Sequence, residues 1–187
     1  MLTSEIAACC KELKLSRNIV EMSEMLQAGS HQEYLLKILQ SELAHRESQR
    51  KDKLLKNAGF YSLKTFAGFC FDEVKLPAEV SPQYLQDCEF IKTKTNLVMY
   101  GNVGTGKTFL SIALGVEACK KGIETRFFRT AALVNRLSEA KKNGTLSVFM
   151  KKISKAELLI CDLCGDISYV EQMGGLRLDL SVMARLQ

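Results

Sequence analysis

The chain has 187 residues, of which 47% are hydrophobic and 25% are charged, as in a globular protein of one or two domains. No apolar run approaches the ~18 residues of a membrane-spanning helix. The first residues lack the charged-then-apolar layout of a signal peptide. Seven cysteines at irregular spacing do not suggest a disulfide framework. We therefore expect a cytoplasmic protein without a membrane partner.

The net charge of +5 is unevenly distributed along the chain. Residues 1–90 contain 11 basic and 13 acidic side chains, whereas residues 91–187 contain 15 and 8. A basic second half suits a polyanionic partner such as a nucleotide or DNA. A solvated basic surface is the alternative interpretation.

Residues 1–59 show the periodicity of helices, which predicts a helical N-terminal domain. Ser30 and Glu33 have the spacing of a capping box, which marks the start of a helix. That helix places Leu35, Ile38, Leu39 and Leu43 on one face and ends near Gly59. Its second half carries five cations that could bind DNA phosphates or form a solvated face: Arg46, Arg50, Lys51, Lys53 and Lys56.

Residues 60–80 form an aromatic connector to the second predicted domain, residues 60–187. The connector could lie over a nucleotide base or pack between the two domains. After it, Ser81 and Pro82 have the pattern of a helix start, and we expect this helix to reach Phe90.

A phosphate-binding loop follows the β-like run 97–100 and precedes a helical run, Thr108–Cys119. Its residues match the pattern G-x-x-x-x-G-K-[ST] and are Gly101, Asn102, Val103, Gly104, Thr105, Gly106, Lys107 and Thr108. Glycines let the backbone curl around a phosphate, and the loop amides face that phosphate. Lys107 is predicted to reach the β- and γ-phosphates, and the Thr108 hydroxyl is predicted to bind Mg²⁺.

A second strand–helix unit separates this loop from an apolar run that ends in an acid. We expect a strand at 125–128, a helix capped by Thr130 that ends at 143–144, and a short amphipathic segment from Leu146 to Ile153. The run 157–162 resembles a strand that presents Asp162 to Mg²⁺. Alternating strands and helices predict an α/β fold with a parallel sheet. Lys107 and Asp162 are the candidate catalytic residues, and Thr108 and Asp162 are the candidate metal ligands.

Together, these motifs resemble the IstB family, the ATP-binding helper proteins of insertion-sequence transposons, over roughly residues 10–175. The resemblance lies in the loop, the run 109–118, the segment 126–135 and the Asp162 strand with Gly165. It implies a helical N-terminal domain followed by a partial AAA+ P-loop NTPase module with three α/β/α layers. It further implies ATP and Mg²⁺ as cofactors, Phe109 as part of the nucleotide site, self-association, double-stranded DNA and a transposase partner.

Two departures from the family pattern alter this expectation. Leu163 stands where the family has the Glu that polarises water, and Asp166 is a poor substitute, so we expect impaired hydrolysis. After residue 175 the sequence no longer resembles the family, which suggests a truncated module in which strand 97–100 pairs directly with strand 158–161. The alternatives are a DnaC-like helicase loader and a catalytically dead nucleotide-binding or dimerising fragment.

Overall fold

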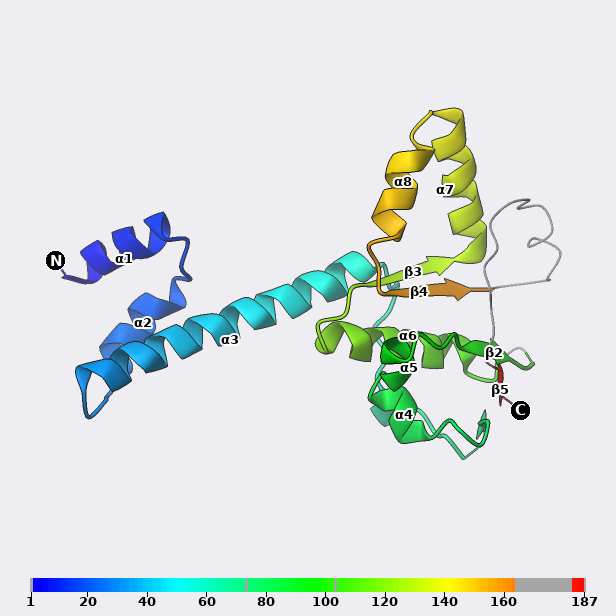
Figure 1. The fold of residues 1–187 in the computed structure, drawn as a ribbon, viewed down its shortest axis with the longest axis horizontal. Helices are drawn as coiled ribbons and strands as arrows, with labels where there is room; N and C mark the ends of the chain where they lie inside the picture. Colours follow the sequence, from blue (N-terminus) through cyan, green and yellow to red (C-terminus); the bar gives the residue numbers. More distant parts are fainter. Residues whose placement is uncertain (1, 73, 103, 164–182, 187) are drawn as a thin grey trace. The chain divides into compact units, whose positions relative to one another are not determined.

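The computed structural model describes residues 2–72, 74–102, 104–163 and 183–186, with no side chains for the last four (Figure 1). The chain divides into two units, Met1–Lys51 and Asp52–Gln187, and helix α3 (His31–Ala58) crosses that boundary. The sequence-based domains 1–59 and 60–187 stay a prediction. No helix among the described residues is long and apolar enough to cross a membrane.

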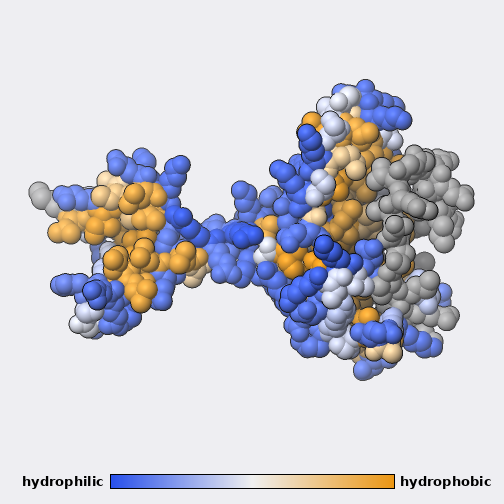
Figure 2. Space-filling view, in the orientation of Figure 1, coloured by the Kyte–Doolittle hydropathy of each residue, from blue (hydrophilic) through white to orange (hydrophobic). Residues whose placement is uncertain are grey.

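The first unit contains α1 (Leu2–Glu12), α2 (Asn18–Met25) and the start of α3. Its core is small, since the buried apolar cluster consists of Cys10, Ile19 and Ile38, one from each helix. Several leucines of α3 stay more than 45% exposed, and Figure 2 shows hydrophobic surface on this unit. The helices therefore leave much apolar area on the surface.

The predicted cap of α3 is present in a slightly shifted form. The Glu33 amide donates to Ser30 Oγ at 3.2 Å, as in a capping box. The Glu33 carboxylate accepts a hydrogen bond from the Gly29 amide at 2.9 Å, one residue before the expected partner. Both bonds satisfy amides near the helix start that would otherwise lack a partner.

The second unit is built around α6 (Lys107–Lys120), which is buried on almost every side. A helix that is apolar all round belongs in a core, and the prediction of a helix after the loop is confirmed. Around it lie η1 (Phe66–Gly68), α4 (Pro82–Gln86), α5 (Glu89–Lys92), β3 (Thr125–Arg129), α7 (Thr130–Lys142), α8 (Leu146–Ile153) and β4 (Leu158–Asp162).

Strands β3 and β4 form a parallel pair between two layers of helices (Figure 1). Successive strand residues point to opposite faces. Phe127 accordingly packs with Ile112 and Val116 of α6, whereas its neighbour Phe128 contacts Phe149 of α8. This mixed α/β arrangement with a helical N-terminal region confirms the predicted fold class and is consistent with a P-loop NTPase-like module.

The predicted pairing of strand 97–100 with strand 158–161 is wrong. Instead, β2 (Val98–Tyr100) pairs in parallel with β5 (Met183–Leu186), which pairs on its other side with β1 (Val74–Lys75). The sequence interpretation assigned no strand to residues 183–186. The late segment supplies backbone partners for one side of β2, and among the described residues β4 pairs only with β3.

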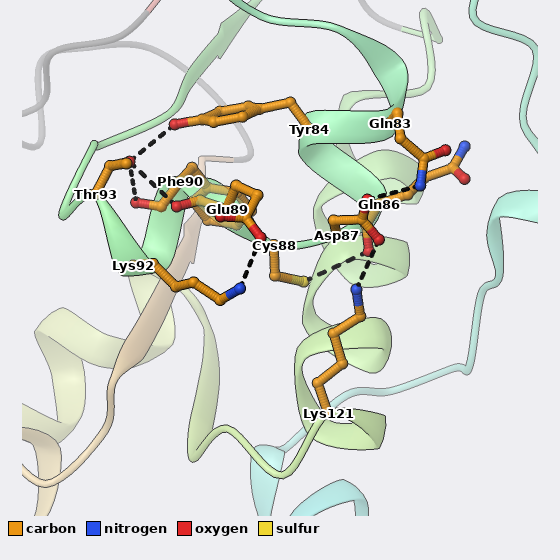
Figure 3. A network of polar contacts seen from close by, with 10 residues as sticks. All are labelled: Gln83, Tyr84, Gln86, Asp87, Cys88, Glu89, Phe90, Lys92, Thr93 and Lys121. Carbon is orange, nitrogen blue, oxygen red and sulfur yellow. Dashed lines mark hydrogen bonds and ion pairs between the residues drawn. The ribbon is translucent and has the colours of Figure 1, made fainter.

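The single helix predicted from Pro82 to Phe90 is two short helices. Cys88 lies between them with φ of 58°, a left-handed conformation that ends the first helix. The break allows Leu85, Cys88 and Phe90 to pack in one buried cluster. Burial raises the pKa of the Cys88 thiol to about 11. Asp87 accepts from Gln83 and pairs with Lys121, which ties α4 to the chain just after α6 (Figure 3).

Candidate nucleotide-binding site

The predicted phosphate-binding loop joins β2 to α6, as the motif requires. Gly104 and Gly106 have φ of 88° and 86°, which glycine tolerates without strain. Gly106 directly precedes α6, and a Cβ there would lie 3.2 Å from the Phe69 ring. The positive φ explains glycine at both positions, and the nearby Phe69 ring adds a steric reason at Gly106. Val103 lies outside the described residues.

The side chain of Lys107 is held within the loop. Its Nζ donates to the carbonyl oxygens of Gly101 at 2.8 Å and Asn102 at 2.7 Å. The Thr105 hydroxyl also donates to the Asn102 carbonyl at 2.9 Å. The ammonium group therefore lies where the loop backbone curls, which is the placement needed for a charge that contacts a phosphate.

Thr108 and Asp162 meet although 54 residues separate them in the chain. Thr108 Oγ1 donates to Asp162 Oδ1 at 2.8 Å, and Asp162 is only 8% exposed at the end of β4. A hydroxyl and a carboxylate are the hard oxygen ligands that suit Mg²⁺. The residues present thus fit a metal–phosphate group, although their role as ligands stays a prediction.

Two residues near this site were missed or misassigned by sequence reasoning. Thr130, expected to cap α7, is instead its first residue, and its hydroxyl donates to the Asp162 carbonyl at 3.2 Å. Phe69 of the connector stacks on Phe109, with ring centroids 5.8 Å apart. The connector thus packs beside the loop, and contact between Phe109 and a nucleotide stays a prediction. No local sequence pattern predicts either contact.

Leu163 follows Asp162 directly and is 47% exposed. A hydrocarbon side chain can neither accept a proton nor orient a water molecule, so this position contributes no general base. Cys164, Gly165 and Asp166 lie outside the described residues.

The cations proposed for DNA contact are partly engaged within α3. Arg46 pairs with Glu42 at 2.7 Å and also donates to the Lys14 carbonyl. Lys51 pairs with Glu47 at 2.6 Å, and this contact lowers the pKa of the Glu47 carboxyl. Internal pairing reduces the charge that these two residues can offer to a phosphate backbone.

Comparison with known proteins finds similar proteins that are named as ATP-binding proteins of insertion sequences. The chain is 31% identical over 150 residues to a protein of Geobacillus stearothermophilus named as an insertion sequence IS5376 ATP-binding protein, covering 80% of this chain and 56% of that protein. It is 30% identical over 138 residues to an IS1162 ATP-binding protein of Pseudomonas fluorescens, covering 71% and 58%. It is 27% identical over 166 residues to an IS21 ATP-binding protein of Pseudomonas aeruginosa, covering 86% and 63%.

The chain spans less than two thirds of the length of each of these relatives. Residues 8–184 match the family described as IstB-like ATP binding protein. The match continues past residue 175, so the expectation that the family resemblance ends there is wrong. The chain belongs to the IstB-like ATP-binding protein family.

Proposed function

We propose that the chain is an ATP-binding helper of a DNA transposase in the cytoplasm, which binds Mg²⁺·ATP at the loop and assembles on double-stranded DNA. The observation that carries nucleotide binding is the hydrogen bond between Thr108 and Asp162, with Lys107 held in the loop directly before Thr108. Bound Mg²⁺ would neutralise phosphate charge, and Thr108 and Asp162 would hold it. The names of the relatives support ATP binding and an insertion-sequence context.

Hydrolysis by this chain should be slow, because Leu163 supplies no group to orient the attacking water. A positioned general base contributes about 10²–10⁴-fold to such proton-transfer steps. This observation favours one alternative function, a nucleotide-binding module that pairs with other copies without turnover. In that case nucleotide binding survives and ATPase activity stays at background.

Self-association is supported by the exposed face of α3. Leu35, Leu39 and Leu43 recur every four residues there and are 57%, 49% and 68% exposed. A helical stripe of this kind is typical of a protein contact surface. DNA binding is supported by the basic second half of the chain and should weaken steeply with salt, since it would depend on phosphate contacts.

Nucleotide binding tests the core of the proposal. A fluorescent ATP analogue would be titrated into the native chain, Lys107→Ala and the control Lys120→Ala. Lys120 has the same charge and lies at the other end of α6, paired with Glu117. Losing a charge-assisted contact costs about 1.5–3 kcal/mol, so Lys107→Ala should weaken binding by about tenfold or more. Equal affinity of all three proteins would contradict the site assignment.

A further inference from the structure

A concave surface of the Asp52–Gln187 unit includes no residue of the loop motif in its lining and has no role in the proposed function. Its volume is about 560 Å³, and we call it the β3-edge groove. It is lined by the end of α3 and the adjoining Gly59 and Tyr61, by β3, and by α7 and α8. Five of its lining residues are cations: Lys56, Arg126, Arg129, Arg136 and Lys152.

Among the described residues, little negative charge compensates the positive charge of the groove. None of its lining residues is acidic, and only Arg126 forms an ion pair, with Glu124 at 3.0 Å. The other four cations form no ion pair with any residue in the described ranges. Residues 126–156 contain eight basic side chains and a single acidic one, Glu139. Opposite charges on a partner would therefore be attracted to this surface.

The groove also has an apolar component. Phe128 and Phe149 contact each other with ring centroids 6.5 Å apart, and Ile153 lies beside them in the lining. All three side chains are half-buried rather than covered. Figure 2 shows hydrophobic surface bordered by hydrophilic side chains over the α7–α8 region. A partner that fills this groove should offer apolar groups as well as negative charge.

Cations of the groove already lie over one face of two of its aromatic rings. Arg129 lies over the Tyr61 ring at 4.5 Å, and Arg136 lies over the Phe128 ring at 5.9 Å. Tyr61 and Phe128 also make edge contacts with Phe127 and Phe149. Base stacking requires a free ring face, and a phosphate backbone gains nothing from apolar side chains. These contacts favour a protein partner over DNA at this surface.

Four successive residues of β3 line the groove, and among the described residues this strand pairs only with β4. The chain at Gly59 already covers the other side of β3, because a Cβ at this glycine would lie 3.2 Å from the Phe127 carbonyl oxygen. A partner segment would therefore bind mainly through its side chains. We infer that the β3-edge groove docks an acidic peptide segment of a partner protein. Its carboxylates would face Arg129, Arg136 and Lys152, and its apolar side chains would face Phe149 and Ile153.

Two matched double variants of the full chain test this inference. Arg136→Gln with Lys152→Gln removes two groove cations, one from α7 and one from α8. Lys141→Gln with Lys151→Gln removes the same charge from the same two helices, at exposed positions outside the groove lining. The probe is a fluorescein-labelled twelve-residue peptide of Glu-Glu-Leu repeats, followed by fluorescence anisotropy. Peptides with Gln in place of Glu, or Ser in place of Leu, report the charge and apolar contributions.

The native chain and the control variant should bind the Glu-Glu-Leu peptide with similar affinity, and the groove variant at least about tenfold more weakly. Both substituted peptides should bind more weakly than the parent. Equal binding by the two double variants would overturn the inference. So would loss of duplex or single-stranded DNA binding in the groove variant alone with peptide binding intact. Circular dichroism checks folding, and retained ATP-analogue binding in both variants separates this outcome from failure of the nucleotide site.

Discussion

The buried carboxylate of Glu42 should be a main stabilising element of the first unit. Glu42 is 4% exposed, and both of its oxygens accept from the Ser16 amide, at 3.2 and 3.1 Å. Arg46 Nε donates to the same carboxylate at 2.7 Å. Glu42 thus joins the α1–α2 connection to α3 in a unit whose apolar core is small. Polar contacts should carry more of the stability here than in a larger core.

The expected loss in the free energy of unfolding depends on which contacts each substitution removes. A hydrogen bond to a charged group contributes about 1.5–3 kcal/mol, and a neutral one about 0.5–1.5. Glu42→Gln keeps an acceptor for Ser16 but loses the charge that Arg46 contacts, so we expect a loss of about 1–2 kcal/mol. Glu42→Ala leaves the Ser16 amide without its acceptor and should cost about 3 kcal/mol.

Native-state hydrogen exchange of the full chain is the suitable assay, because it reports the free energy of opening for each region. Protection should fall in residues 2–51 and stay unchanged around α6. Glu47→Gln is the control, since Glu47 is 65% exposed in its pair with Lys51 and exposed pairs contribute little to stability. A Glu42→Gln effect no larger than the control effect would refute this reasoning.

Lowering the pH should reduce the hydrogen-exchange protection of residues 2–51 in the native chain, as Glu42→Gln should at neutral pH. The hydrogen bonds from Ser16, with a contribution from Arg46, hold the pKa of the Glu42 carboxyl below its usual value. A lowered carboxyl pKa stabilises the folded form above the unfolded pKa, and this contribution is lost as the pH falls through the folded pKa. Protection of residues 2–51 should therefore decline below about pH 4.5. Glu42→Gln should decline less over the same range.

Three further outcomes are expected in the second unit. Asp162→Asn should abolish the enhancement of ATP-analogue binding by Mg²⁺, measured by titration with and without the metal, because the carboxylate beside Thr108 is the predicted ligand. Gly115→Ala should lower the thermal unfolding temperature. Its Cβ would lie 2.6 Å from the Phe60 ring, and overpacking of about 1–3 kcal/mol exceeds a helix-propensity gain of about 1. Cys88 should resist iodoacetamide at pH 8 until urea is added, as peptide mass spectrometry would show, because its pKa is raised to about 11 by burial.

The strand and helix on either side of the predicted phosphate loop were predictable because their signals are local in the sequence. A fixed glycine and lysine spacing between a strand and a helix specifies a phosphate loop without knowledge of distant contacts. An apolar strand that ends in an acid is a weaker indication, so this feature alone would not identify Asp162 as a metal ligand. The strand–helix unit between the loop and this strand strengthened that prediction. The structure brings Asp162 to Thr108, the neighbour that this interpretation required.

The break at Cys88 and the pairing of β2 were not predictable in the same way. Local propensity favours one continuous helix after Pro82, but tertiary packing needs Leu85, Cys88 and Phe90 on one buried surface. Packing outweighs the cost of a left-handed cysteine, which is about 1–2 kcal/mol. Pairing of β2 with residues 183–186 is a long-range contact, and the intervening sequence carries no signal of it.

The position of the Asp162 carboxylate depends on contacts that no motif contains. Its backbone carbonyl accepts from Thr130 at the start of α7, and its side chain accepts from Thr108 at the start of α6. In the β3–β4 pairing it lies beside Arg129, which lines the β3-edge groove. The sequence specifies an aspartate at position 162. The orientation of its side chain depends on α6 and α7, the two helices that begin on either side of the strand pair. A substitution at Thr130 would therefore disturb the predicted metal site without removing any predicted ligand.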